Sequence, residues 1–64
     1  MRELHIVMRA VLEDGTHEQI DILDVGIVAI NESFLTIYSN DENVVSQVIG
    51  QFMLTEIIGY WIEE

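Results

Sequence analysis

The sequence predicts a small all-β fold, an antiparallel meander or partly closed barrel of five to six short strands. In residues 2–12, apolar side chains recur at every second position and so fall on one face, which is the pattern of a half-buried strand. An Asp-Gly pair separates this run from a second alternating run, and Asp-Gly between apolar runs is a strong hairpin signal. Val, Ile and aromatic residues are frequent in residues 44–62, which favours strands there as well.

The first hairpin is predicted to turn at Asp14 and Gly15, because glycine adopts a positive φ at little cost. The return strand covers residues 17–23, where the apolar side chains again alternate. Counting outward from a two-residue turn places His17 opposite Leu12 or Glu13. A bend or bulge follows at residues 24–26, where a glycine interrupts the pattern.

A second hairpin is predicted from residues 27–30 and 34–38, joined by the polar segment 31–33. In the second arm, Leu35 and Ile37 lie on the face opposite to Phe34, Thr36 and Tyr38.

The last third of the sequence allows two interpretations. A capping box at residues 39–42 and an apolar half-circle over residues 44–53 fit antiparallel strands followed by one C-terminal helix at about 41–53 or longer. The richness of the same region in Val, Ile and aromatic residues, with two glycines, favours strands instead. We prefer strands for residues 44–53 and 57–62, with a turn at 52–56, and keep the α+β arrangement as the alternative.

The chain has 64 residues, two basic and twelve acidic side chains, and a formal net charge of −10. This length supports a single domain over residues 1–64, and such a domain buries only about 60% of the surface that its unfolded chain exposes. Half of the residues are nevertheless apolar. We therefore expect a homodimer or higher homo-oligomer, in which part of the apolar surface is covered by another copy.

Composition excludes several functional classes. Without cysteine there is no disulfide and no thiolate ligand for zinc, and two arginines cannot neutralise the six to ten phosphates of a typical DNA site. No apolar run reaches the roughly 20 residues of a membrane span, and no signal segment is recognised. We expect a protein of the cytoplasm that contacts neither membrane nor nucleic acid directly.

Candidate catalytic groups are few. His5 and His17 are expected to be surface imidazoles, and no serine has a neighbouring base or a nucleophile motif. The carboxylates show no metal-binding loop spacing. We therefore expect a protein that is not an enzyme, with no catalytic residues, no cofactor and no metal site.

Charge and aromatic residues suggest where a partner binds. Acidic side chains at Glu18, Asp21 and Asp24 are predicted to form a negative surface that steers a basic partner. Tyr60 and Trp61 are of the residue types that dominate interface hot spots, and they lie in the most apolar segment of the chain. These five residues are the predicted partner-binding set.

The runs at residues 34–38, 44–45 and 51–61 resemble small acidic β-meander proteins of bacteriophage and mobile elements. This resemblance implies an inhibitor of a host enzyme or defence system, and it assigns no role to any single residue. We expect a non-enzymatic inhibitor or regulator that docks on a basic or nucleic-acid-handling host protein. The alternatives are a ligand-sequestering or sensor module that binds a small molecule at a dimer cleft, and a structural subunit of a larger assembly.

Overall fold

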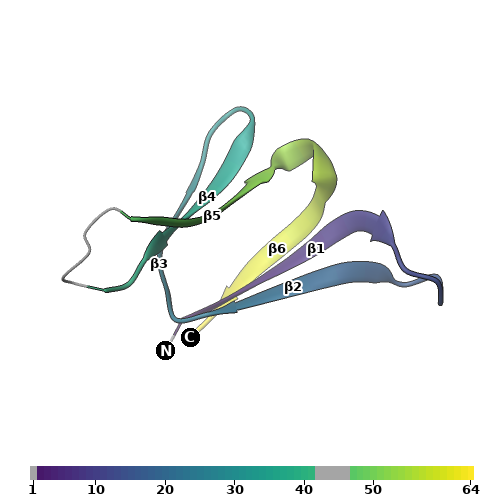
Figure 1. Cartoon of the computed structure of the whole chain (residues 1–64), viewed down its shortest axis with the longest axis horizontal. Helices are drawn as coiled ribbons and strands as arrows, with labels where there is room; N and C mark the ends of the chain where they lie inside the picture. Colours follow the sequence, from purple (N-terminus) through teal and green to yellow (C-terminus); the bar gives the residue numbers. More distant parts are fainter. Residues whose placement is uncertain (1, 42–46) are drawn as a thin grey trace.

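The computed structural model describes residues 2–41 and 47–64, and it is all-β (Figure 1). Six strands form two antiparallel three-stranded sheets, which confirms the predicted fold class. The elements are β1 (Glu3–Val11), β2 (His17–Leu23), β3 (Val25–Ile30), β4 (Phe34–Ser39), β5 (Val48–Met53), the single 3₁₀ turn η1 (Leu54–Glu56) and β6 (Ile57–Glu63).

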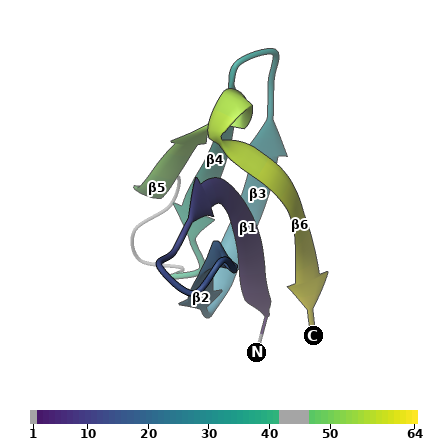
Figure 2. The same ribbon diagram turned by 90° about the vertical axis from the view of Figure 1, so that its right-hand side faces the viewer.

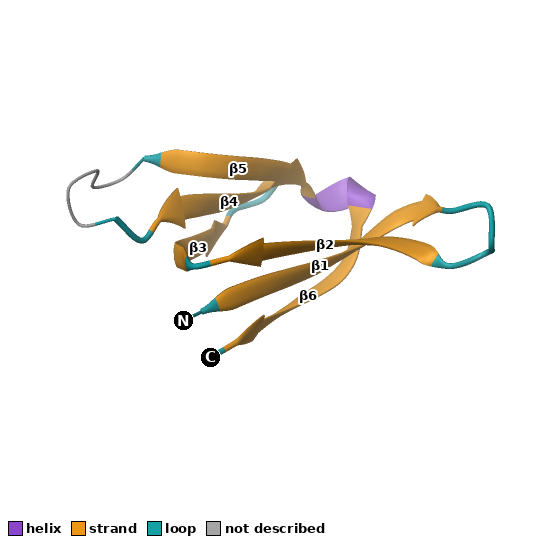
Figure 3. Ribbon diagram, turned by 60° about the horizontal axis from the view of Figure 1, so that its bottom comes forward, coloured by secondary structure: helices purple, strands orange, loops and turns teal. Residues whose placement is uncertain are grey.

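The two sheets pack against each other and do not close into a barrel. Sheet A has the strand order β2-β1-β6, and sheet B has the order β3-β4-β5 (Figure 3). Seen from the side, η1 carries the chain from sheet B back to sheet A (Figure 2). The first and last strands pair antiparallel from Glu3 opposite Glu63 onward, so the two ends of the chain are neighbours.

The first hairpin turns where the sequence predicts. Gly15 has a φ of 88°, and Asp14 Oδ1 accepts hydrogen bonds from the backbone N–H and the hydroxyl of Thr16, at 3.0 Å and 2.6 Å. His17 pairs with Val11, so the prediction that it lies opposite Leu12 or Glu13 is wrong by one residue. The loop is longer than a two-residue turn because the Leu12 N–H bonds the Thr16 carbonyl, at 2.7 Å.

β2 and β3 are nearly one continuous run of chain that bends at Asp24 and passes from sheet A to sheet B. Asp24 has a φ of 55°, which few residues other than glycine adopt easily. A Cβ built on Gly26 would lie 2.4 Å from the carbonyl oxygen of Ser39, so the backbones of β3 and β4 approach too closely for any side chain there. The predicted bend at residues 24–26 is confirmed, and it forms the corner of the fold.

The core lies between the inward faces of both sheets. Alternation points Leu4 and Ile6 of β1 toward Leu35 and Ile37 of β4, and all four are fully buried. The other buried apolar residues are Met8, Val25 and Ile57. This core is small, which agrees with the molecule's dimensions of 41 × 26 × 15 Å and its accessible surface of 4550 Å², against roughly 4,200 Å² for a folded chain of this mass.

The described part of the last third forms two strands joined by the short turn η1. Residues 48–53 form β5 and residues 57–63 form β6, so the alternative of a helix at 41–53 is wrong for 48–53 and the preferred strands are confirmed there. Residues 42–46, which include Val44 and Val45, lie outside the described part. The predicted turn at 52–56 is confined to 54–56, because Phe52 still pairs with Leu35. No helix among the described residues is long and apolar enough to cross a membrane.

Gly26→Ala should lower the free energy of unfolding by about 1–3 kcal/mol, the usual cost of overpacking, because its Cβ meets backbone that cannot rotate away. Gly59→Ala is the matched control, since a Cβ there meets nothing within 4 Å. Urea unfolding of both variants checks this. Equal effects of the two substitutions would mean that the corner tolerates a side chain.

Gly15→Val should destabilise the protein by about 1 kcal/mol or more, because a β-branched residue resists the positive φ of this turn. No atom lies near the added Cβ, so the loss comes from backbone conformation and not from crowding. Thermal unfolding measures it. An unchanged melting temperature would show that the hairpin turns elsewhere in solution.

Candidate functional site

His5 lies at the centre of the outward face of sheet A. Its neighbours Leu4 and Ile6 point into the core, so the alternation of β1 directs the imidazole outward. The register places Asp21 of β2 opposite it on one side and Trp61 of β6 opposite it on the other. Three side chains from three adjacent strands therefore form one row across the sheet.

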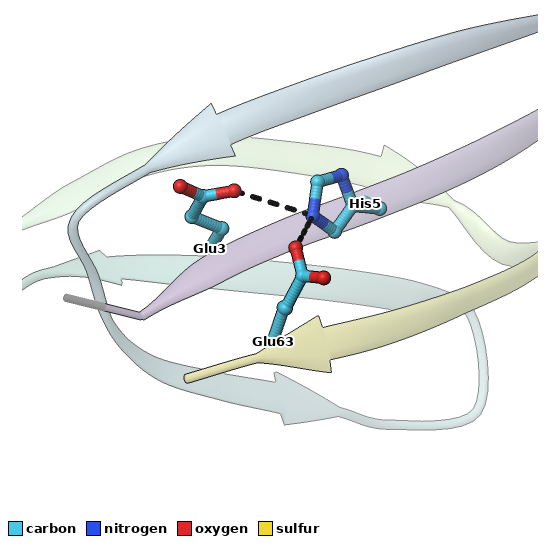
Figure 4. Close-up of side chains that lie close together, drawn as sticks. All are labelled: Glu3, His5 and Glu63. Carbon is cyan, nitrogen blue, oxygen red and sulfur yellow. Dashed lines mark hydrogen bonds and ion pairs between the residues drawn. The ribbon is translucent and has the colours of Figure 1, made fainter.

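Both ring nitrogens of His5 face carboxylates. Nδ1 lies 2.6 Å from Asp21 Oδ1, and Nε2 lies 3.1 Å from Glu63 Oε2. Nε2 also lies 3.5 Å from Glu3 Oε2, and the imidazole sits between the two glutamates (Figure 4). A ring with an acceptor at each nitrogen is satisfied as imidazolium, which donates a hydrogen bond from both N–H groups.

The electrostatics favour the charged forms of His5 and Asp21. The hydrogen bond that His5 donates to Asp21 raises the pKa of His5 above its ordinary value of 6.5, against an opposing effect of desolvation, and Glu63 raises it further. The pKa of Asp21 is lowered, first by the hydrogen bond from the Gln19 amide and then by His5. One imidazolium against three carboxylates leaves the cluster with a net negative charge.

Trp61 completes the site. Its indole stacks on the imidazole with ring centroids 4.9 Å apart and an angle of 21° between the planes. Trp61 remains 45% exposed, while the side chain of His5 is only 12% exposed. The sheet thus presents a half-exposed aromatic ring beside carboxylates. This combination suits a cationic group such as arginine, which stacks on aromatic rings and bonds carboxylates.

Glu3, His5 and Glu63 also offer three potential ligand atoms that lie within 4.8 Å of one another. A metal ion at His5 Nε2 would have to displace the proton that this nitrogen shares with Glu63. The hydrogen bond to Asp21, and then that to Glu63, raises the pKa of the imidazole and so favours that proton. Ion pairing accounts for the convergence of these groups without a metal.

The structure brings together two of the five predicted partner-binding residues. Asp21 and Trp61 both contact His5. Tyr60 is 42% exposed but is paired with Ile6, on the opposite face of β6. Asp24 lies at the corner, where it accepts a hydrogen bond from Asn40 Nδ2 at 3.0 Å, and Glu18 is exposed near the start of β2.

His5, Glu3 and Glu63 are the site residues that the sequence did not indicate. The sequence predicts an ordinary surface imidazole at His5. It does not indicate the carboxylate partners, because they lie 16 and 58 positions away along the chain. The even spacing of Glu3 and His5 on one strand places both on the same face. Only the pairing of β1 with β6 adds Glu63 to them.

His5→Gln should reduce stability in a pH-dependent way. Folding raises the pKa of His5. Its contribution to the free energy of unfolding is therefore complete when the pH lies below the unfolded pKa of 6.5, and it is lost as the pH rises through the pKa of the folded protein. The lowered pKa of Asp21 means that its contribution is complete above 3.8 and is lost on further acidification. The difference between wild type and variant in melting temperature should therefore be largest between these limits and shrink at about pH 9.

His17→Gln serves as the control, because it removes the other imidazole of the chain, whose ring contacts the backbone carbonyls of Met8 and Arg9, and leaves the cluster around His5 unchanged. The pH dependence described above is then the part of the His5 effect that the His17 variant does not share. If the His5 variant showed the same loss at about pH 5 and at about pH 9, the imidazolium would not hold this cluster together.

Comparison with known proteins bears on how the site can be assigned. No protein-family model, curated protein or solved structure matches the chain. The chemistry of the cluster around His5 and the distribution of charge over the two sheets are therefore the observations on which a function is proposed.

Proposed function

We propose that this chain is a non-enzymatic binding protein that docks an acidic and aromatic surface on a basic region of another protein and thereby inhibits or regulates it. This acidic–aromatic surface consists of Glu3, His5, Asp21, Trp61 and Glu63. The observation that carries the proposal is the half-exposed Trp61, held by His5 beside three carboxylates. An aromatic ring with carboxylates beside it attracts the cationic side chains of arginine and lysine.

Only two arginines stand against twelve acidic side chains, and both are held by contacts within the chain. Nη1 of Arg2 donates a hydrogen bond to the Gly26 carbonyl at 2.6 Å, and the same guanidinium lies 3.5 Å from Glu64. Nε of Arg9 donates to the Thr55 carbonyl at 2.7 Å. With a net charge of −10, the molecule attracts basic surfaces from a distance, which raises the rate of encounter.

The preorganisation of Trp61 favours tight binding. The stack on His5 restricts the indole before a partner arrives, so little side-chain entropy remains to be lost on docking. Tryptophan is also among the residues that contribute most to interface energies.

A partner of this kind is a nucleic-acid-handling protein, whose phosphate-binding groove is basic and accepts carboxylates in place of phosphates. We include in the proposal that the chain acts in the cytoplasm of a host cell as an antagonist of host defence. The acidic–aromatic surface would then compete with nucleic acid for the groove.

The fluorescence of Trp61 tests the proposal directly, because it is the only tryptophan of the chain. Titration with an octa-arginine peptide should change its emission, and the affinity should fall as NaCl is raised from about 50 mM to about 500 mM. The double variant Asp21→Asn, Glu63→Gln should weaken binding by about tenfold or more.

The matched control is Glu18→Gln, Asp24→Asn, which removes the same charge from positions outside the acidic–aromatic surface. It should weaken binding much less, since only the general field of the molecule is reduced. Equal losses in the two double variants, or no change in Trp61 emission, would show that binding follows net charge and has no defined surface.

A further inference from the structure

The three strands of sheet B carry no Asp, Glu, Lys, Arg or His side chain. Among the residues that the structure describes, every charged side chain lies instead in sheet A or in a segment that connects or ends the strands. In a chain with a net charge of −10, an entire sheet without charge is a distinct surface, because exposed edge strands ordinarily carry charged side chains.

The outward side of this sheet is uncharged, and the apolar side chains on its two edge strands are exposed. Because Leu35 and Ile37 point into the core, the alternate residues of β4 and their partners on the flanking strands point outward. This neutral face consists of Ala29, Phe34, Thr36, Tyr38, Val48, Gln51 and Met53. Met53 and Val48 are each 50% exposed, and Ile27 at the edge of the same sheet is 67% exposed.

The polar side chains at the centre of the neutral face are bonded to each other. Gln51 Nε2 donates to Thr36 Oγ1 at 3.2 Å, and Thr36 is buried. Covering this face keeps that hydrogen bond within its own sheet and buries no charged side chain. Exclusion of water from the neutral face therefore costs less than at the acidic–aromatic surface, where carboxylates would have to be desolvated.

The distribution of charge over the two sheets favours a second copy of the chain as the partner of the neutral face. Contact between two copies through sheet A would bring the carboxylates around His5 in one copy against those of the other. Contact through the neutral face places the core of each copy, with its sheets about 10 Å apart, between these clusters and the interface. That spacing exceeds the Debye length of about 8 Å in physiological salt. A basic protein, by contrast, gains nothing from a face that carries no charge.

We propose that the neutral face is the contact surface between two copies of this chain, which stack sheet B on sheet B about a two-fold axis. Each copy then contributes the same patch, as in other isologous dimers, and the acidic–aromatic surfaces face outward on opposite sides. The inference is independent of the proposed function, because it concerns the other face of the molecule.

The size of the neutral face sets the expected strength of the dimer. Three strands of six residues make a sheet about 20 Å long and about 14 Å wide, roughly 280 Å² of sheet plane. Stable complexes bury about 800 Å² on each partner. The dimer is therefore weak, with a dissociation constant in the micromolar range or above.

Sedimentation equilibrium from about 10 µM to about 1 mM protein tests this. The mass should rise from 7.4 kDa toward twice that value, and higher NaCl should shift the rise to lower protein concentration, because salt screens the repulsion between like-charged copies. Salt should weaken octa-arginine binding over the same range, so the two proposals can fail separately.

Met53→Glu should keep the protein monomeric at concentrations where wild type is a dimer. Val11→Glu is the matched control, because it adds the same charge at a residue that is 58% exposed on the first hairpin, and it should dimerise like wild type. Ile27→Glu repeats the test from the opposite edge of sheet B should Met53→Glu fail to fold by circular dichroism. A monomer at about 1 mM in high salt, equal dimerisation of all variants, or growth beyond a dimer would overturn the proposal.

Discussion

The bend at Asp24–Gly26 joins the two sheets, and the position of every other strand follows from it. Val25 is fully buried there, and its N–H donates to the Arg2 carbonyl at 3.1 Å, which fixes the start of β1 against the start of β3. The Arg2 side chain donates a hydrogen bond to the Gly26 carbonyl, and the backbone of Ser39 in β4 lies close to Gly26. Since a three-stranded sheet cannot bury its apolar face alone, a corner that presses the two sheets together is the condition for a core in so short a chain.

The shared core leaves the two outward faces chemically independent. Inward positions of both sheets are constrained to be apolar, whereas outward positions are free to differ. The outward face of sheet A carries the ion-paired cluster around His5, and the strands of sheet B carry no charged side chain. The two contacts proposed above therefore use different faces of the domain, the charged face of sheet A for a basic partner and the uncharged face of sheet B for a second copy.

Strand existence could be predicted from alternation and turn chemistry, but pairing could not. A two-residue turn at Asp14-Gly15 would pair His5 with Asp24, whereas the longer loop and the bulge between Val7 and Val11 shift the register so that His5 meets Asp21. Each irregularity is local, yet it moves every pair beyond it. The sequence therefore predicts only two members of the site, Asp21 from its charge and Trp61 from its aromatic ring. His5 and its glutamates become a cluster only through strand pairing.

Four of the six described strands, β2, β6, β3 and β5, lie at sheet edges. Open edges expose unpaired N–H and C=O groups that can pair with another chain, and many proteins protect them with lysine, proline or a covering segment. This chain has neither lysine nor proline, so mutual repulsion between highly negative molecules is its main protection against edge-to-edge pairing. The protection disappears near the isoelectric point of about 4.1, where the net charge vanishes. The acidic composition therefore keeps an open-edged β protein soluble, and acidic compartments or fixation at low pH are conditions under which it would form intermolecular sheets.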